Sequence, residues 1–298
     1  MPLLKSADWP LLIDLYFFLG GIAAGAFIVA GVADLWGGAR DRAVVRIGSY
    51  LALLAIIPCP ILLTIDLGMP QWFHHMLWTF KPQSPMNLGS WALLGFGVCS
   101  FLMALGIFLE DRGSRALLAD LLRRVRQPVG VLGSLFGFFI AAYPGVLLGA
   151  TARPLWTEGR MLGALFLFVG ATTGMAAVAL VLALQGGEAG RALAKLRRGY
   201  TICLVLQAVA LALFLIIVGT GSPAAGQALR LLVAGAYAPT FWNGAVIIGL
   251  VVPFALEVRE GFLKGYPGRA RGLAVIVSLL ILIGGFLTKY VIMVAGQA

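Results

Sequence analysis

Eight long apolar runs dominate this 298-residue sequence and restrict the folds open to it. A membrane-spanning helix needs about 20 mainly apolar residues. Runs of this kind lie at Leu11–Trp36, Val44–Ile65, Leu88–Leu109, Val129–Thr151, Met161–Leu184, Tyr200–Gly219, Leu231–Leu256 and Gly272–Val294. Backbone polar groups must be paired within lipid, and these runs lack the apolar–polar alternation of barrel strands. We therefore predict an all-α, polytopic membrane protein, with eight transmembrane helices bundled into one integral membrane domain over residues 1–298.

The charge content agrees with a surface that faces lipid. Charged residues make up 11% of the sequence, whereas a water-soluble domain carries about 25%. The formal net charge of +10 would suit nucleic acid in a soluble protein. Here the basic side chains cluster between the apolar runs, so membrane lipid is the expected partner and nucleic acid is not.

Basic residues fall mostly in alternate connections, which predicts the orientation. Lys and Arg are enriched on the cytoplasmic side of membrane proteins. Sixteen of the 22 basic residues lie around the first, third, fifth and seventh connections: Arg40, Arg42, Arg46, Arg112, Arg115, Arg123, Arg124, Arg126, Arg191, Lys195, Arg197, Arg198, Arg259, Lys264, Arg269 and Arg271. We expect a multi-pass protein of the inner (cytoplasmic) membrane, with both termini on the periplasmic side.

Glycine pairs at helical spacing predict close contacts between the spans. Small residues four apart let two helices approach closely in lipid. Three such pairs are Gly21 and Gly25, Gly133 and Gly137, and Gly145 and Gly149. They indicate a tightly packed bundle and carry no chemistry.

The histidines and cysteines argue against a redox metal in this protein. A haem within the membrane needs axial ligands, commonly histidines inside the spans. His74 and His75 are adjacent in a connection, and Cys59, Cys99 and Cys203 are isolated within apolar runs. We expect no haem, iron–sulfur cluster or other metal here.

Polar residues near the ends of the spans are the candidates for function. Tyr143 precedes Pro144, which has no N–H and so leaves one backbone carbonyl of the helix unpaired. The Tyr143 hydroxyl either bonds a ligand carbonyl or bonds that freed backbone carbonyl. Asp66 follows the Pro58-Cys59-Pro60 break, and Asp14 lies in the first span. Interfacial carboxylates are often simple anchors, and intramembrane ones mark functional sites. Lys289, inside the last span, either snorkels to the interface or has an internal role.

The connection from Asp66 to Trp91 has an unusual composition. It contains three prolines, both histidines and several aromatic residues. Irregular backbone is costly in hydrocarbon, so the segment should lie at the interface or against a partner. It is either an aromatic belt around a surface loop or a docking platform for a peripheral subunit beside a ligand pocket.

Three motifs together resemble the NrfD/polysulfide reductase membrane-subunit family. They are YFFLGGIAAGAF in the first span, LLTIDLGMPQWFHHMLW with KPQSPMNLGSW, and YPGVLLGATARPLW, in the family's order. The resemblance covers the whole sequence and implies an eight-helix membrane anchor that binds a quinone, menaquinone or ubiquinone, near the outer face. It also implies a docked ferredoxin-like, four-cluster iron–sulfur subunit and, beyond it, a molybdopterin catalytic subunit.

The resemblance extends to candidate site residues. Tyr143 matches a tyrosine implicated in quinone binding in the family, and Tyr16 stands where some members have a histidine. We expect a pocket between spans one, two and four, with Tyr143, Tyr16, Arg153 and His75 contacting the quinone. Asp66 and Asp14 are the candidates for proton exchange, because quinone chemistry moves two protons with two electrons.

Two other functions are compatible with the sequence. Broken helices and internal charges also occur in secondary transporters and ion channels, although we find no internal repeat or paired set of interrupted helices. The other alternative is a family member that anchors its complex without a working quinone site. The substrate of the complex, the direction of electron flow and proton pumping are not encoded in any motif of the sequence.

Overall fold

The computed structural model describes residues 9, 11–38, 41–67, 69–113, 117–185, 190–262 and 271–298. Within these ranges the protein is helical and has no strand. Eight helical segments are long and apolar enough to cross a membrane: Leu11–Trp36, Arg42–Asp66, Pro85–Asp111, Leu117–Gly149, Leu162–Gln185, Gly190–Gly219, Thr240–Gly261 and Arg271–Gln297. The predicted all-α fold with eight spans is confirmed.

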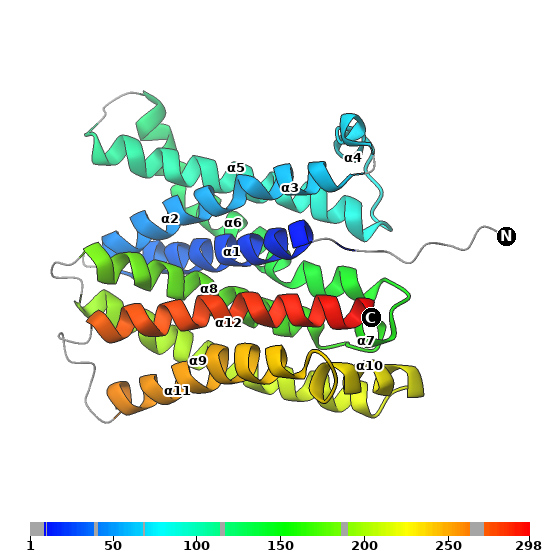
Figure 1. The fold of residues 1–298 in the computed structure, drawn as a ribbon. Coiled ribbons are helices and arrows are strands. Elements are labelled where there is room, and N and C mark those ends of the chain that lie inside the picture. The colour runs from blue at the N-terminus through cyan, green and yellow to red at the C-terminus, as the bar shows by residue number, and fades with distance from the viewer. Residues whose placement is uncertain are drawn as a thin grey trace.

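The spans form two groups that meet at the centre of the bundle (Figure 1). The first group contains α1 (Leu11–Trp36), α2 (Arg42–Ile56), α3 (Pro58–Asp66), α5 (Pro85–Asp111) and α6 (Leu117–Gly149). The second contains α8 (Leu162–Gln185), α9 (Gly190–Gly219), η3 (Thr240–Val251), α11 (Val252–Glu257), η4 (Val258–Phe262) and α12 (Arg271–Gln297). Helix α1 packs against α2 and α6 of its own group and against α8 and α12 of the second group, so it connects the two groups.

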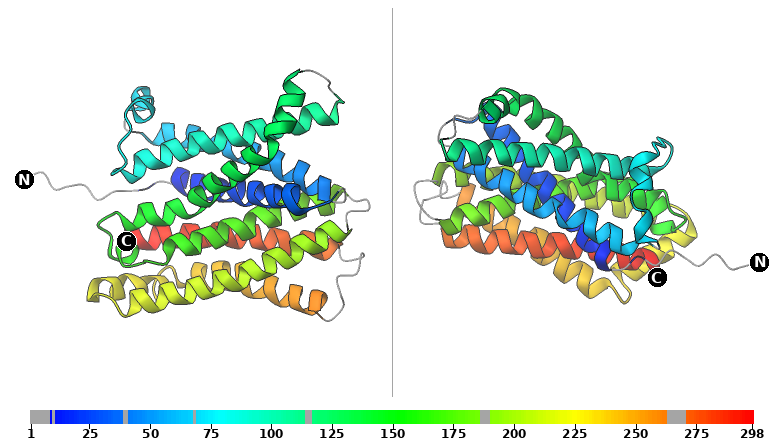
Figure 2. Two further views of the ribbon diagram at one scale, coloured as in Figure 1. Left: turned by 180° about the vertical axis from the view of Figure 1, so that it is seen from behind. Right: turned by 90° about the horizontal axis from the view of Figure 1, so that it is seen from above.

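Four short helices gather at the end of the bundle where the described residues begin and end (Figures 1 and 2). They are η2 (Pro70–Trp72), α4 (His75–Trp78), α7 (Pro154–Thr157) and α10 (Pro223–Val233). We call this the terminal end. The opposite end carries the first, third, fifth and seventh connections, and we call it the basic end.

Glycines bring the two groups into backbone contact. A Cβ atom added to Gly25 would lie 3.0 Å from Cα of Gly174 and 3.1 Å from the carbonyl carbon of Gly170, both on α8. Gly170 and Gly174 therefore form a second small-residue pair that receives the pair on α1. Gly133 and Gly145 also lie at tight helix contacts, so the predicted contact role is confirmed for at least one glycine of each pair, whereas Gly149 has only an ordinary contact of 3.7 Å with Trp156 O.

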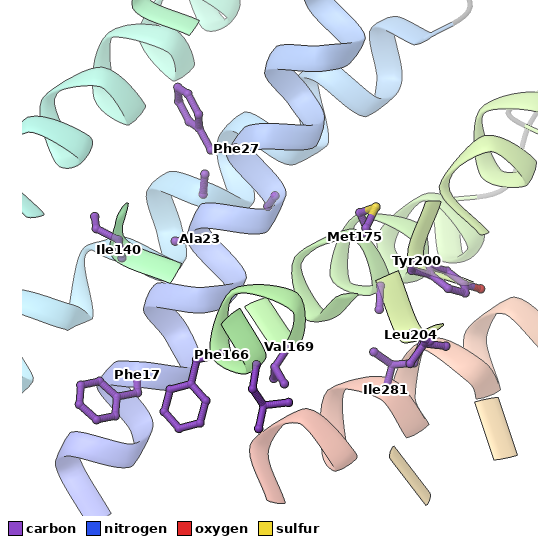
Figure 3. Close-up of a cluster of buried hydrophobic side chains, with 14 of the residues drawn as sticks. Phe17, Ala23, Phe27, Ile140, Phe166, Val169, Met175, Tyr200, Leu204 and Ile281 are labelled. Carbon is purple, nitrogen blue, oxygen red and sulfur yellow. The ribbon is translucent and has the colours of Figure 1, made fainter. Parts of the chain in front are cut away.

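Large side chains fill the space on either side of this contact (Figure 3). Phe17 and Phe27 from α1 and Phe166 from α8 are at most 1% exposed. Farther into the second group, Tyr200 of α9 and Ile281 of α12 complete the same buried cluster. Interiors without voids gain dispersion energy from many contacts, which holds helices together where lipid offers no hydrophobic drive.

Helix boundaries differ from the sequence prediction in three places. Helix α6 begins at Leu117 and α9 at Gly190, because each extends beyond the apolar run as a charged helical segment at the basic end. The seventh span begins at Thr240 and not at Leu231, since residues before it form the separate helix α10. Ser222 caps α10 by accepting a hydrogen bond from Ala225 N, and Pro223 suits its first turn.

Ion pairs tie the helices together at and near the basic end. Arg126 of α6 bonds Asp34 of α1 at 2.9 Å and Glu110 of α5 at 3.0 Å. In the second group, Arg197 of α9 pairs with Glu257 of α11 at 3.1 Å, and both side chains are at most 2% exposed. Removing one partner of such a buried pair would leave an uncompensated charge in a low-dielectric interior, which is strongly destabilising.

Outside the spans, Glu158 links two of the short helices at the terminal end. Its carboxylate accepts a hydrogen bond of 2.8 Å from Ser222 N, just before α10. Hydrogen bonds from Ser222 hold the pKa of Glu158 below its usual value, so this link is retained at neutral pH.

Candidate functional site

A cavity of about 750 Å³ lies in the first group of helices at the terminal end. Its walls come from α1, α2, α3, α5 and α6, and the connection after α3 closes its outer side. Most of its lining is apolar, including Phe17, Leu53, Leu93 and Leu147. A volume of about 300–1,000 Å³ with few polar groups is typical of sites for organic ligands. The pocket was expected from spans one, two and four, and the third span also contributes a wall.

Tyr143 reaches the cavity from α6, and α5 is shaped to receive it. The tyrosine is 6% exposed, and its ring stacks on Phe139 with centroids 5.6 Å apart. A Cβ atom at Gly89 of α5 would lie 2.6 Å from the Tyr143 hydroxyl oxygen and 2.8 Å from Cε1. Only glycine leaves this space open. Helix α6 continues through Pro144, so the predicted kink residue does not end the helix.

Tyr16 and Asp66 line the same cavity from other elements. Tyr16 is a buried residue of α1, next to Phe17, which also lines the cavity. Asp66 is the last residue of α3 and is solvent-exposed, so it connects the apolar interior to the terminal end. At the Pro58–Pro60 segment the predicted break is confined to one residue: α2 ends at Ile56 and α3 begins at Pro58, while Ile57 between them keeps helical φ and ψ angles.

The connection after α3 forms the outer cover of the cavity. Phe73, Met76 and Leu77 line the cavity from this segment. Asn87, at the start of α5, holds the segment in place: its Nδ2 donates to Met76 O at 2.7 Å and to Thr79 O at 2.8 Å. Its Oδ1 accepts from Lys81 N at 2.8 Å. Asn87 was missed in the sequence, because its partners lie 6, 8 and 11 positions earlier in an irregular connection that no local pattern marks.

Three predicted site residues lie outside the described lining of the cavity. Asp14 is 1% exposed, and its Oδ1 has no hydrogen-bond partner among the described residues. Arg153 is half-buried at the residue before α7, and its carbonyl accepts hydrogen bonds from Trp156 N and Thr157 N. His75 is exposed and contacts Trp72 with its ring tilted, the ring centroids being 4.6 Å apart. Their proposed roles remain predictions, and the cavity itself brings together Tyr16, Asp66 and Tyr143.

Lys289 does not snorkel to the interface. Its side chain is 1% exposed, and Nζ donates to the carbonyl oxygen of Phe17 at 2.6 Å. The amine also lies 5.4 Å from the ring centroid of Phe166. The lysine therefore turns inward from α12 and contacts the helix that forms one wall of the cavity.

A second cavity of about 490 Å³ lies between α1, α6, α8 and α9. It is lined mainly by apolar residues such as Ile28, Phe138 and Leu167. Asp41 and Lys195 also line it, and they form an ion pair of 2.6 Å toward the basic end. Among its described lining residues there is no tyrosine or histidine to bond a ligand carbonyl. It is a weaker candidate for recognising a polar head group.

No group of three or more His, Cys, Asp or Glu side chains suited to a metal ion occurs among the described residues. The described residues form a multi-pass helical membrane protein whose cavity near the terminal end combines an apolar lining with Tyr16, Asp66 and Tyr143. Comparison with known proteins agrees with this class. The model of the NrfD polysulphide reductase family matches residues 4–298, so the protein belongs to that family.

Individual relatives match along nearly their whole length. The C subunit of polysulfide reductase from Wolinella succinogenes is 28% identical over 304 residues, covering 97% of this sequence and 93% of the relative. An NrfD homologue of Haemophilus influenzae is 24% identical, with 97% and 94% covered. The NrfD protein of Escherichia coli is 25% identical with the same coverage.

Proposed function

We propose that this protein is the quinone-binding membrane anchor of a multisubunit oxidoreductase. The observation that carries the proposal is the cavity of about 750 Å³, in which an apolar lining surrounds Tyr16, Asp66 and Tyr143. A bound quinone needs hydrogen-bond donors for its carbonyl oxygens, an apolar slot for its tail and a route for protons. The cavity offers all three in one place, and a quinone supplies two-electron, two-proton chemistry when bound.

The proposed role of each lining residue follows from its position in the cavity. Tyr143 and Tyr16 can donate hydrogen bonds to carbonyl oxygens from α6 and α1. Asp66, at the exposed end of α3, can exchange protons with water at the terminal end. Ile57 and Leu94 line the cavity and are 50% and 45% exposed, which gives the site a lateral opening toward lipid.

The proposal extends to partner subunits at the terminal end. The segment with Trp72, Phe73 and Trp78 is exposed at the terminal end and covers the cavity. We propose that an iron–sulfur subunit docks there, so that its cluster lies near the cavity, and that a molybdopterin subunit lies beyond it. The Wolinella relative is named as one lettered subunit of polysulfide reductase, which supports an assembly of several polypeptides. The basic end then faces the cytoplasm, in keeping with the distribution of Lys and Arg.

Two substitutions test the site in the intact complex. Tyr143→Phe removes one hydrogen-bond donor and Asp66→Asn removes the ionisable group, while both keep side-chain size. We expect each to lower quinone-dependent turnover by about tenfold, the effect of one hydrogen bond to a ligand. Activity with an artificial water-soluble dye, which bypasses the membrane site, should be unchanged.

The control is Tyr50→Phe, because Tyr50 of α2 is half-buried and is not among the described lining residues. It should retain quinone-dependent turnover. Unchanged quinone kinetics in both Tyr143→Phe and Asp66→Asn would remove these residues from the mechanism. A purified protein that transports a solute without partner subunits would instead favour the transporter alternative.

A further inference from the structure

Lys289 is a buried amine with no carboxylate partner among the described residues. Its described contacts are the Phe17 carbonyl, at 2.6 Å, and the face of the Phe166 ring, at 5.4 Å. Asp14 lies on the same face of α1 as Phe17 and Gly21 by helical spacing. No described ion pair joins it to Lys289, and its Oδ1 atom has no hydrogen-bond partner among the described residues. A charge inside a bilayer is costly, so an ionisable residue kept there points to a function.

The position of Lys289 is built into the packing of α1. A Cβ atom at Gly21 would lie 2.7 Å from Nζ of Lys289, so glycine at this position makes room for the amine. Thr288, the neighbouring residue of α12, has its one described side-chain hydrogen bond within its own helix, to Gly284 O. Of these two neighbouring side chains, Lys289 bonds to α1 and Thr288 bonds within α12.

Only one helix wall separates the amine from the cavity. Phe17 both accepts the hydrogen bond from Lys289 and lines the cavity. Cys59 of α3 packs against the neighbouring residue of α1, because its thiol donates to Tyr16 O at 3.9 Å. Tyr16 and Pro60, next to Cys59, are also lining residues. The amine thus lies behind the α1–α3 side of the cavity.

The described lining of the cavity holds no cation of its own. Of the described residues that line it, none is Lys, Arg or His, and the one carboxyl group is that of Asp66. Negative charge on a reduced head group would be unfavourable in such an apolar, acidic space. A protonated amine nearby offsets that penalty, and its charge acts over longer distances in a low-dielectric interior than in water.

We propose that Lys289 supplies the positive charge of this cavity and sets its preference for anionic, quinone-like head groups. It acts through the α1 wall as a positioning and electrostatic residue and does not contact the ligand. This inference rests on the proposed quinone-binding function. It adds a residue from α12, in the second group of helices, to a site built otherwise from the first group.

The test compares two ligands of nearly equal shape and different charge. A 2-hydroxy-3-alkyl-1,4-naphthoquinone is a vinylogous acid that is already ionised in near-neutral buffer, and its 2-methoxy analogue is neutral. Affinity of both is measured on the purified complex for the wild type, Lys289→Met and Lys289→Gln. Methionine keeps the unbranched shape beside Gly21, and glutamine keeps a donor for Phe17 O without the charge. Thr288→Val is the control that alters the same turn of α12 and leaves the charge.

We expect both Lys289 variants to lose about tenfold or more in affinity for the anionic ligand, the scale of one modest charge interaction. Their affinity for the neutral ligand should change little, and Thr288→Val should resemble the wild type for both. Equal losses for both ligands would show a purely structural lysine and overturn the inference, as would wild-type affinity for the anion in Lys289→Gln. If Lys289→Met does not assemble, Lys289→Gln decides the question. A wild-type complex that binds neither ligand would overturn the proposed function as well.

Discussion

At the scale of single residues, glycines make room for the two polar side chains in and behind the cavity, Tyr143 and Lys289. Tyr143 was recognisable in the sequence because a tyrosine beside a proline stands out within an apolar run. Gly89, which accommodates the Tyr143 ring, could not be found in this way, since its function depends on a side chain 54 positions later in the sequence. Lys289 could be recognised in the sequence as an isolated basic residue within a span. That its side chain turns inward depends on the space left by the missing side chain of Gly21. Sequence patterns show which residues are unusual and leave open where their side chains point.

A substitution of Gly89 tests this fit. In Gly89→Ala the new methyl group would lie within 2.8 Å of Cζ, Cε1 and the hydroxyl oxygen of Tyr143, so the ring must move. We expect the apparent affinity for quinol, measured as KM in the intact complex, to weaken by about tenfold, as for the loss of one ligand contact.

Gly97→Ala is the matched control for Gly89→Ala. Gly97 also lies on α5 and lines the same cavity, but a Cβ atom there would meet nothing within 4 Å. It should leave KM close to the wild-type value. Equal effects of the two alanines would show that the position of Tyr143 is unimportant.

Whole elements were the best-predicted feature, because length and apolar content identify a span without knowledge of its neighbours. Their ends were less predictable. The charged first turns of α6 and α9 are helical because Arg126, Arg197 and Lys195 find partners on other helices or in the connection before α2. Those partners lie far away in the sequence, so local apolar content underestimates the length of both helices. The small-residue pair on α1 was predicted, whereas its counterpart on α8 is separated by threonines and was overlooked.

The contact between α1 and α8 can be tested by adding a single methyl group. Gly25→Ala would place Cβ 3.0 Å from Cα of Gly174 and close to the Gly170 carbonyl, and backbone atoms cannot move aside. We expect a loss of about 1–3 kcal/mol in stability, the usual cost of overpacking. The measurement is the thermal denaturation midpoint of the purified protein, which should fall by several degrees.

The comparison for Gly25→Ala is Gly226→Ala on α10, where a Cβ atom would meet nothing within 4 Å. Because alanine favours helix over glycine, this variant should be neutral or slightly stabilising. A Gly25→Ala protein as stable as the Gly226→Ala protein would show that the two helices are not in the close contact described.

At the scale of the whole molecule, function depends on which end of the bundle faces which compartment. The cavity and the short helices lie at the terminal end, and most basic connections lie at the other. Sequence alone predicted this segregation, because basic residues could be counted by connection. The predicted pocket between spans one, two and four omitted the wall from α5, because Gly89 and Leu93 of that span carry no polar signal in the sequence.

Orientation can be measured with single added cysteines. Gln71→Cys lies in the exposed segment at the terminal end, and Gly38→Cys is exposed at the basic end. Background labelling should be low, because Cys59 and Cys99 are buried and Cys203 is half-buried. In spheroplasts, a membrane-impermeant thiol reagent should label the Gln71→Cys protein and spare the Gly38→Cys protein until the membrane is opened. The reverse order would place the cavity on the cytoplasmic side and contradict the proposed arrangement.

The central claim is that a quinone binds in the larger cavity, and photo-crosslinking tests it most directly. The intact complex is illuminated with an azido-quinone, and the labelled peptides of this protein are identified by mass spectrometry. Label should fall on residues that line the larger cavity, such as Leu93 of α5 and Leu147 of α6, and excess natural quinone should suppress it. Specific label confined to the second cavity, for example at Leu167 or Cys203, would contradict the account.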